Sequence, residues 1–165
     1  MKMRCMLKKL MIVGCMAAVI FVQKPVYAEG LDELGTVVDG SLLTDLLVVE
    51  DDSRDLLRGN YLSYGTASLV NHEDGTVSAG GSTIAHVVCD KVYLTLTLQQ
   101  KVGDDWYDYR TWKRTTTNAS SLSKEYTVEV PSGFFYRVQG AHLVEKDGDN
   151  TESQVTLTDG VWVAY

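Results

Sequence analysis

Val92-Tyr93-Leu94-Thr95-Leu96-Thr97-Leu98-Gln99 alternates apolar and polar side chains without a break. Successive side chains of a β-strand point to opposite faces of a sheet, so this stretch predicts a strand with one apolar face and one polar face. The valine and the three leucines would face the core, and the tyrosine, the threonines and the glutamine would face outward. Such a strand needs other strands beside it.

Seven further runs of this kind lie between Tyr61 and the end of the chain. They cover residues 61–70, 76–79, 83–89, 106–116, 122–130, 134–145 and 153–164. Turn-forming residues separate them, including Gly80-Gly81 and a loop rich in Ser, Thr and Asn around Asn118. Strands spaced about ten residues apart, with no helices between them, predict an all-β domain, an antiparallel β-sandwich of about seven strands.

The segment Val130-Pro131-Ser132-Gly133-Phe134-Phe135-Tyr136 resembles the corner that enters the sixth strand of immunoglobulin-like and fibronectin type III domains. In those domains a tyrosine hydroxyl bonds back to the backbone upstream, and Tyr136 would take that role. The sandwich is therefore expected to be immunoglobulin-like. It would lack the disulfide of that fold, because Cys89 is the only cysteine beyond the first 28 residues. We expect Cys89 to be buried, with intermolecular pairing as the alternative.

The first 28 residues have the three parts of a secretory signal peptide. Residues 1–9 carry four bases and no acid, residues 10–22 are an unbroken apolar run, and small side chains precede a cleavage position after Ala28. A helix over the apolar run would reach about 20 Å, whereas the hydrocarbon core of a bilayer is about 30 Å thick. We therefore expect a secreted protein with no stable membrane span after cleavage. Retention by an uncleaved signal, or lipidation at Cys15, is the alternative.

Three segments follow from these patterns: a signal peptide at 1–28, a flexible acidic leader at 29–58 and the β-sandwich domain at 59–165. The leader holds nine acids and two bases, and four leucines between residues 42 and 47 have the spacing of a short helix after Ser41. Without residues 1–28 the chain keeps 10 bases against 22 acids, a net charge of −12. This charge argues against nucleic acid as a partner, because phosphates are neutralised by Lys and Arg.

Four segments of the predicted domain also carry a family resemblance. They are Tyr61-Leu62-Ser63-Tyr64-Gly65, Cys89-Asp90-Lys91-Val92-Tyr93-Leu94, Thr117-Asn118-Ala119-Ser120-Ser121-Leu122-Ser123-Lys124 and Gly133-Phe134-Phe135-Tyr136-Arg137-Val138. Together they resemble an uncharacterised family of small secreted proteins from gut Firmicutes. The resemblance implies export and a bacterial source. It implies no activity and no functional residues, because the family is a domain of unknown function.

Aromatic side chains crowd the predicted strand at 106–116. Trp106 and Trp112 have the same parity, which would place both on one face of the sheet, with Tyr109 close by. Exposed aromatic rings stack on sugars and anchor peptide ligands. Trp106, Tyr109 and Trp112 are therefore the predicted ligand contacts, for a glycan or a protein at the cell exterior. Packing of these rings in the core is the alternative.

Residue types that carry catalysis are sparse. His86 and Cys89 are three residues apart on a predicted strand and would point to opposite faces, and His142 could reach Cys89 only through a tertiary contact. No nucleophile elbow, HExxH helix or phosphate-binding glycine loop is present in the sequence. The acidic stretch at 147–152 fits a hairpin turn as well as a calcium loop. We therefore predict no catalytic residue, no metal site and no cofactor.

Taken together, these patterns predict a secreted, acidic bacterial protein of unknown function. Its expected role is that of a non-enzymatic extracellular binding or interaction module. A small extracellular hydrolase is one alternative, and a structural or colonisation factor of the cell envelope is another. The sequence predicts no particular oligomeric state.

Overall fold

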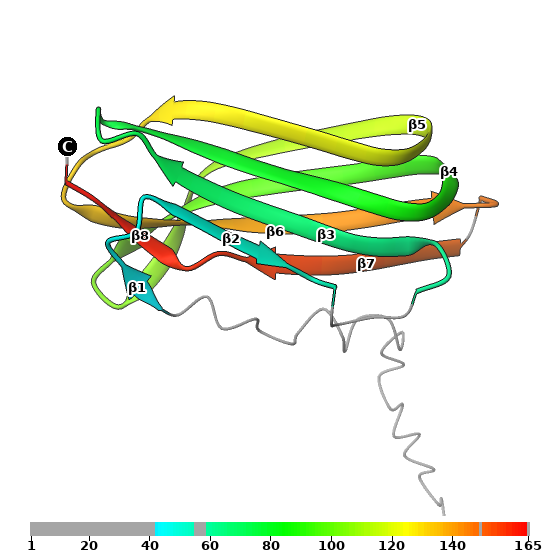
Figure 1. The fold of residues 1–165 in the computed structure, drawn as a ribbon, viewed down its shortest axis with the longest axis horizontal. Helices are drawn as coiled ribbons and strands as arrows, with labels where there is room; N and C mark the ends of the chain where they lie inside the picture. The colour runs from blue at the N-terminus through cyan, green and yellow to red at the C-terminus, as the bar shows by residue number, and fades with distance from the viewer. Residues whose placement is uncertain (1–41, 55–58, 149, 165) are drawn as a thin grey trace, which may run out of the picture.

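The computed structural model describes residues 42–54, 59–148 and 150–164, and the regular structure in these ranges is β-strand (Figure 1). The strands are β1 (Leu43–Thr44), β2 (Val48–Asp52), β3 (Leu62–Asn71), β4 (Thr76–Val102), β5 (Asp105–Glu129), β6 (Phe134–Lys146), β7 (Asn150–Leu157) and β8 (Gly160–Val163). The all-β prediction is confirmed. The predicted signal peptide at 1–28 lies outside the described residues.

Two strands are much longer than the sequence predicted. β4 has 27 residues and joins three predicted runs, and β5 has 25 residues and joins two. The predicted turn at Gly80-Gly81 is wrong, because Gly80 pairs with β3 on one side and with β5 on the other. A Cβ on Gly81 would lie 2.7 Å from the side chain of Leu96, so glycine allows that side chain to pack directly against the backbone here. The predicted loop around Asn118 is a kink inside β5, where Asn118 has a φ of 50°.

All eight strands belong to one sheet with the order β1-β8-β6-β4-β3-β2, in which β5 pairs with β4 and β7 pairs with β6. The pairs are antiparallel except that β1 and β8 run parallel, so the sheet is mixed. The N-terminal half of β4 pairs with β3 and its C-terminal half pairs with β6, with an irregular stretch between Ile84 and Cys89. The sheet curls strongly at this stretch (Figure 1). The described strands thus form one curled sheet, and they are not divided between two sheets as in an immunoglobulin domain.

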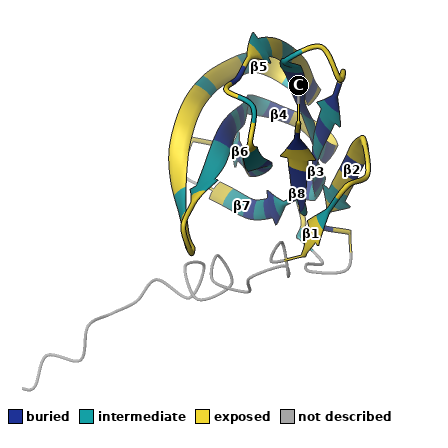
Figure 2. Ribbon diagram, turned by 90° about the vertical axis from the view of Figure 1, so that its left-hand side faces the viewer, coloured by how far each residue is buried: buried dark blue, intermediate teal, exposed yellow. Residues whose placement is uncertain are grey.

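The core fills the inside of the curl, where Figure 2 shows dark blue residues. Val92, Leu94, Leu96 and Leu98 are each at most 1% exposed, so the predicted apolar face of this stretch is confirmed. The two halves of β4 meet across this core, since the Thr83 hydroxyl donates to the carbonyl oxygen of Tyr93 at 2.9 Å. Apolar side chains from β3, β6 and β8 complete the same cluster.

Residues 42–54 join the sheet, which corrects the expectation of a flexible leader over this part of the chain. β2 pairs with β3 through five residues, and β1 pairs with β8. The predicted helix after Ser41 is wrong: its four leucines are 41–63% exposed and have no surface to bury a helical face against. Free edges of β3 and β8 offer backbone hydrogen bonds instead. Residues 29–41 and 55–58 of the predicted leader lie outside the described residues.

Tyr136 is fully buried at the start of β6. Its hydroxyl donates to the carbonyl oxygen of Pro131 at 2.8 Å and accepts from Nε2 of Gln100 at 2.9 Å. Burial raises the pKa of this hydroxyl to about 12. The backbone hydrogen bond that the sequence predicted for Tyr136 is therefore present.

Side chains close the gap between β7 and the opposite part of the curl. The carboxylate of Glu152 accepts the backbone N–H groups of Asn60 at 2.9 Å, Tyr61 at 2.9 Å and Leu62 at 2.7 Å. Asp51 accepts the N–H of Leu157 at 2.7 Å. The two carboxylates thus link segments that are not paired by backbone hydrogen bonds, because each accepts backbone N–H groups from the facing segment.

We expect Glu152→Ala to lower the free energy of unfolding by about 2 kcal/mol, because three backbone donors lose a charged acceptor at once. Urea unfolding at neutral pH measures this change. The matched control is Glu129→Ala on β5, which removes an exposed carboxylate and should cost less than about 0.5 kcal/mol. Equal losses in the two variants would contradict the closing role of Glu152.

Candidate functional site

The predicted aromatic contacts do not share a face. In the register with β4, Trp112 lies opposite the buried Leu96, whereas Trp106 lies opposite Lys101 on the outer side. The register shifts between these positions, where Tyr109 is an extra residue on β5. Such a bulge reverses the alternation of side chains beyond it. The prediction of one shared face is therefore wrong, because counting by twos does not detect a bulge.

Trp112 and Tyr109 both turn toward the inside of the curl. Trp112 packs against the core and stacks on Tyr126, with ring centroids 5.0 Å apart and ring planes at 2°. Tyr109 meets Tyr136 edge to face with centroids 5.9 Å apart, and its own side chain is 40% exposed. These rings are thus partly core and partly surface.

Trp106 lies at the other end of the bulge and packs over β8. A Cβ on Gly160 would lie 2.8 Å from the Trp106 ring, so the glycine makes room for it. The guanidinium of Arg137 lies 4.2 Å from the ring centroid, and Nζ of Lys101 lies 5.9 Å away. One face of this indole is therefore already occupied by a cation.

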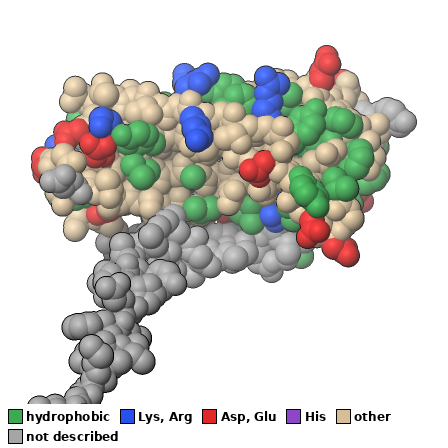
Figure 3. Space-filling view, turned by 180° about the vertical axis from the view of Figure 1, so that it is seen from behind, with side chains coloured by type: hydrophobic (Ala, Val, Ile, Leu, Met, Phe, Trp, Pro, Cys, Tyr) green, Lys and Arg blue, Asp and Glu red, His purple; other side chains and the backbone are tan. Residues whose placement is uncertain are grey.

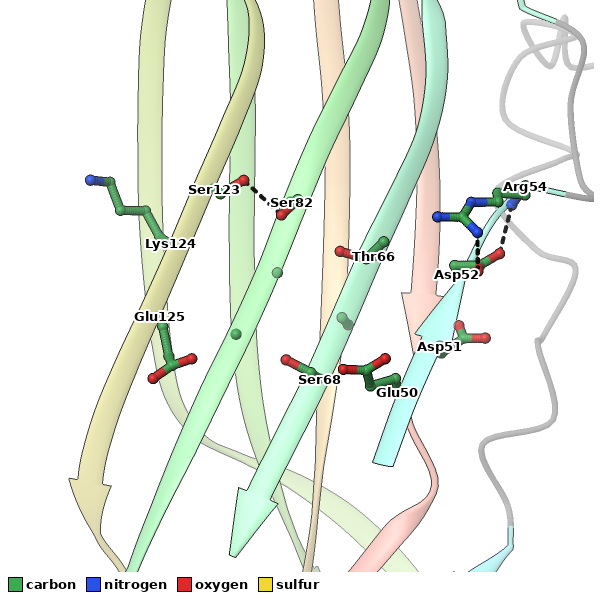
Figure 4. A pocket seen from close by; sticks show the side chains of 13 residues that line it. Glu50, Asp51, Asp52, Arg54, Thr66, Ser68, Ser82, Ser123, Lys124 and Glu125 are labelled. Carbon is green, nitrogen blue, oxygen red and sulfur yellow. Dashed lines mark hydrogen bonds and ion pairs between the residues drawn. The ribbon is translucent and has the colours of Figure 1, made fainter. Parts of the chain in front are cut away.

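The structure has a groove that the sequence analysis missed. It is a hollow of about 610 Å³ on the outer face of β2, β3, the N-terminal half of β4 and the C-terminal half of β5 (Figure 4). Two rows of residues cross it in register. The rows are Glu50-Ser68-Gly80-Glu125 and Asp52-Thr66-Ser82-Ser123. Side chains paired directly across antiparallel strands share a face, so both rows point into the groove.

Small residues form the floor of the groove. A Cβ on Gly80 would lie 2.6 Å from Oγ of Ser68, so a larger residue here would displace its neighbour. The hydroxyls of Ser82 and Ser123 are 2.7 Å apart and bond to each other. With Thr66 and Ser68 they give a floor of hydroxyl groups around the buried Gly80. Such a floor can both donate and accept hydrogen bonds.

Charged side chains border this floor on both sides. Glu50 and Asp52 stand on β2, and Glu125 stands on β5 (Figure 4). Arg54 lies near Asp52, with Nη1 3.7 Å from Oδ2, and its guanidinium lies 4.5 Å from the centroid of the Tyr64 ring. Lys124 lines the other side, next to Glu125, so the border is mainly anionic with one cation on each side.

The groups considered for thiol chemistry have separate partners. His142 is 1% exposed, and its ring nitrogens bond to the hydroxyls of Thr83 at 3.0 Å and Thr156 at 2.9 Å. Cys89 is 1% exposed, which confirms the expected burial, and its Sγ lies 3.5 Å from the carbonyl oxygen of Val87. Burial raises the pKa of the Cys89 thiol. The arrangement keeps the thiol protonated and the imidazole engaged with threonines.

Within residues 42–54, 59–148 and 150–164, no three side chains among His, Cys, Asp and Glu are placed to hold one metal ion. No helix in those ranges is long and apolar enough to cross a membrane.

Fold and groove together define a small all-β protein whose single curled sheet carries a polar groove on its outer face. The chain belongs to the Family of unknown function (DUF6147), which it matches over residues 48–160. The match begins at the first residue of β2 and ends at the first residue of β8, so it covers β2 to β7 and includes both sides of the groove. No curated protein matches the chain. The resemblance to an uncharacterised family agrees with this assignment.

Proposed function

We propose that this protein is a secreted, non-enzymatic binding module that holds an extracellular glycan in the groove. The groove carries the proposal, because hydroxyls line its floor and carboxylates border it on both sides. Export is supported by the charged, apolar and small-residue parts of the first 28 residues. It is also supported by the resemblance to secreted bacterial proteins.

A sugar chain matches the chemistry of the groove. Sugar hydroxyls donate to carboxylates in charge-assisted hydrogen bonds, and they both donate to and accept from serine and threonine hydroxyls. Three inter-strand spacings separate the backbones of β2 and β5, about 14 Å in all, which is room for a chain lying along the strands. Ser68, Ser82 and Ser123 would contact the ring hydroxyls, and Glu50 and Glu125 would hold the two sides of the chain.

Binding is favoured over the alternative of a thiol hydrolase. Cys89 and His142 are buried, and each bonds to other groups of the fold. A nucleophilic cysteine needs an accessible thiolate beside a base, whereas burial raises the pKa of this thiol. The polar side chains of the two groove rows, in contrast, are exposed or half-exposed and have hydrogen-bonding capacity to spare.

We expect Ser82→Phe to weaken glycan binding about tenfold or more, because a phenyl ring would fill the floor and replace a hydroxyl. Titration calorimetry against purified neutral oligosaccharides, including mucin-type chains, measures the dissociation constant. Glu125→Gln keeps the shape of the groove and should weaken binding less, through loss of a charged acceptor alone.

Thr115→Phe is the matched control, since Thr115 is exposed on the other half of β5. It should leave the affinity unchanged. Equal affinities for the parent protein and the Ser82→Phe variant, or no binding of any oligosaccharide by the parent, would overturn the proposal.

A further inference from the structure

Basic side chains are concentrated on β5 although the protein is acidic. Four of the ten bases beyond residue 28 fall in a 15-residue stretch, and no acid lies between Asp108 and Glu125. These bases are Arg110, Lys113, Arg114 and Lys124. All four are exposed, as is most of β5, which is largely yellow in Figure 2. Among the described strands β5 pairs with β4 alone, so its other edge has no strand partner in these ranges.

None of these four bases forms an ion pair with any residue that the structure describes. Elsewhere the bases do find carboxylates: Nζ of Lys91 lies 3.0 Å from Oε1 of Glu145, and Lys146 lies near Asp90 and Asp147. The cations on β5 therefore keep their charge available to an anion from outside the described structure.

Aromatic rings lie between these cations. Arg110, Trp112 and Arg114 share one face of β5, and Trp112 lies opposite Leu96, so this face turns inward. Because the strand curls back on itself, Trp112 stacks on Tyr126 from its other half. The guanidinium of Arg110 lies 5.7 Å from the Trp112 ring, and that of Arg114 lies 5.3 Å from the Tyr126 ring.

We call Arg110, Trp112, Arg114, Lys124 and Tyr126 the β5 seam. Figure 3 shows Lys and Arg side chains gathered along one long border of the molecule, with hydrophobic side chains between them. The seam adjoins the groove, because Lys124 also lines the hollow beside Glu125, while the other four residues of the seam do not line it. Ser123 and Glu125 point into the groove, whereas Lys124 and Tyr126 alternate with them and point to the opposite face. In Figure 4 Lys124 extends away from the groove floor.

We propose that the β5 seam binds an acidic polysaccharide, a sugar chain that carries carboxylate or sulfate groups. Arginine presents a planar fork of donors that pairs with carboxylate and sulfate oxygens, and the half-buried rings offer apolar surface to the sugar. Arg110 and Arg114 are four residues apart, about 13 Å along a strand, so they would engage successive charged groups of one chain.

The charge of the whole protein favours this partner over nucleic acid. Beyond residue 28 the net charge is −12, which repels a polymer with one charge every few ångströms. A polysaccharide with about one carboxylate or sulfate per sugar is less densely charged than double-stranded DNA and offers stacking faces as well as anions. The inference does not depend on the glycan proposed for the groove, because Arg110, Trp112, Arg114 and Tyr126 do not line the groove and Lys124 belongs to neither row of its floor.

The test is binding of the full chain to immobilised polygalacturonate and to dextran sulfated at about one group per sugar, at low salt, with unmodified dextran as the neutral matrix. Arg110→Gln with Arg114→Gln should weaken binding to both acidic polymers about tenfold or more, and binding should fall as salt is raised. The control double variant, Lys101→Gln with Lys146→Gln, removes the same charge away from the seam. Its affinity should change less than about twofold.

Lys124→Glu supplies a second, single variant at an exposed position, and thermal melts of all variants report on folding. The groove variant Ser82→Phe should bind the acidic polymers as the parent does, which separates the two sites. Equal weakening by the two double variants, parental binding by Lys124→Glu, or equal binding to unmodified dextran would overturn the inference. Tighter binding to double-stranded DNA than to either polysaccharide would overturn it as well.

Discussion

Replacing Gly65 by alanine is expected to lower the free energy of unfolding by about 4 kcal/mol, enough to unfold a marginally stable domain. A Cβ at this position would lie 2.5 Å from Nε2 of His142, and closer still to its Cδ2 and Cγ. Both residues are buried, and Thr83 and Thr156 hold the imidazole from its two nitrogens. The ring therefore has no room to retreat without losing these hydrogen bonds.

A double-mutant cycle tests the cause of this loss. His142→Ala removes the ring and leaves space for the new methyl group, so Gly65→Ala should cost far less in that background. Urea unfolding of the four proteins measures the coupling. Additive losses would mean that the overlap with His142 is not what makes glycine necessary at position 65.

Stability is also expected to fall by about 3 kcal/mol as the pH drops from neutral to about 4. Burial lowers the pKa of His142 from 6.5 to about 4, because the ring is enclosed and its nitrogens bond to neutral threonine hydroxyls. Below pH 6.5 the imidazole of His142 is protonated in the unfolded chain, whereas in the folded protein it stays neutral until about pH 4. This part of the stability is therefore complete above pH 6.5 and is lost progressively between the two values.

Denaturant unfolding at several pH values between 4 and 7 measures this dependence. In His142→Gln the side chain cannot be protonated, and its amide can still bond to a threonine hydroxyl. This variant should be less stable at neutral pH but should lack most of the decline across the window. Hydrogen bonds to Lys91 and Tyr93 lower the pKa of the Glu145 carboxyl from 4.5. Its contribution to the stability of the protein is therefore lost mainly as the pH falls below that value. If the stability of His142→Gln falls between pH 7 and pH 4 as steeply as that of the parent protein, the assignment of this pH dependence to His142 is wrong.

The strands could be predicted from the sequence because their alternation is a local property. Every side chain of the apolar face of 92–99 is buried as predicted. The ends of the strands were harder to predict, because Gly80-Gly81 suits a turn and also suits the close approach of two backbones. The structure uses it for the second purpose, as the position of Leu96 beside Gly81 indicates. The spacing of the leucines before β2 is likewise too short a pattern to distinguish a helical turn from an edge strand.

The groove could not be predicted, because its residues come from four strands that are distant in the sequence. Glu50, Gly80 and Glu125 become neighbours only through the registers of β2 with β3, β3 with β4 and β4 with β5. The aromatic prediction failed at one residue, since Tyr109 at the bulge separates Trp106 and Trp112 onto opposite faces. A single extra residue is invisible to a count of alternating positions.

The long hairpin of β4 and β5 ties the two ends of the molecule together. One end of the hairpin pairs with β3 and the other with β6, so neither half of the sheet keeps its central strand if the hairpin is divided. The domain therefore contains no smaller autonomous folding unit. A protease that cuts near the exposed kink at Asn118 would release no stable fragment, and loss of the protein would follow an all-or-none course.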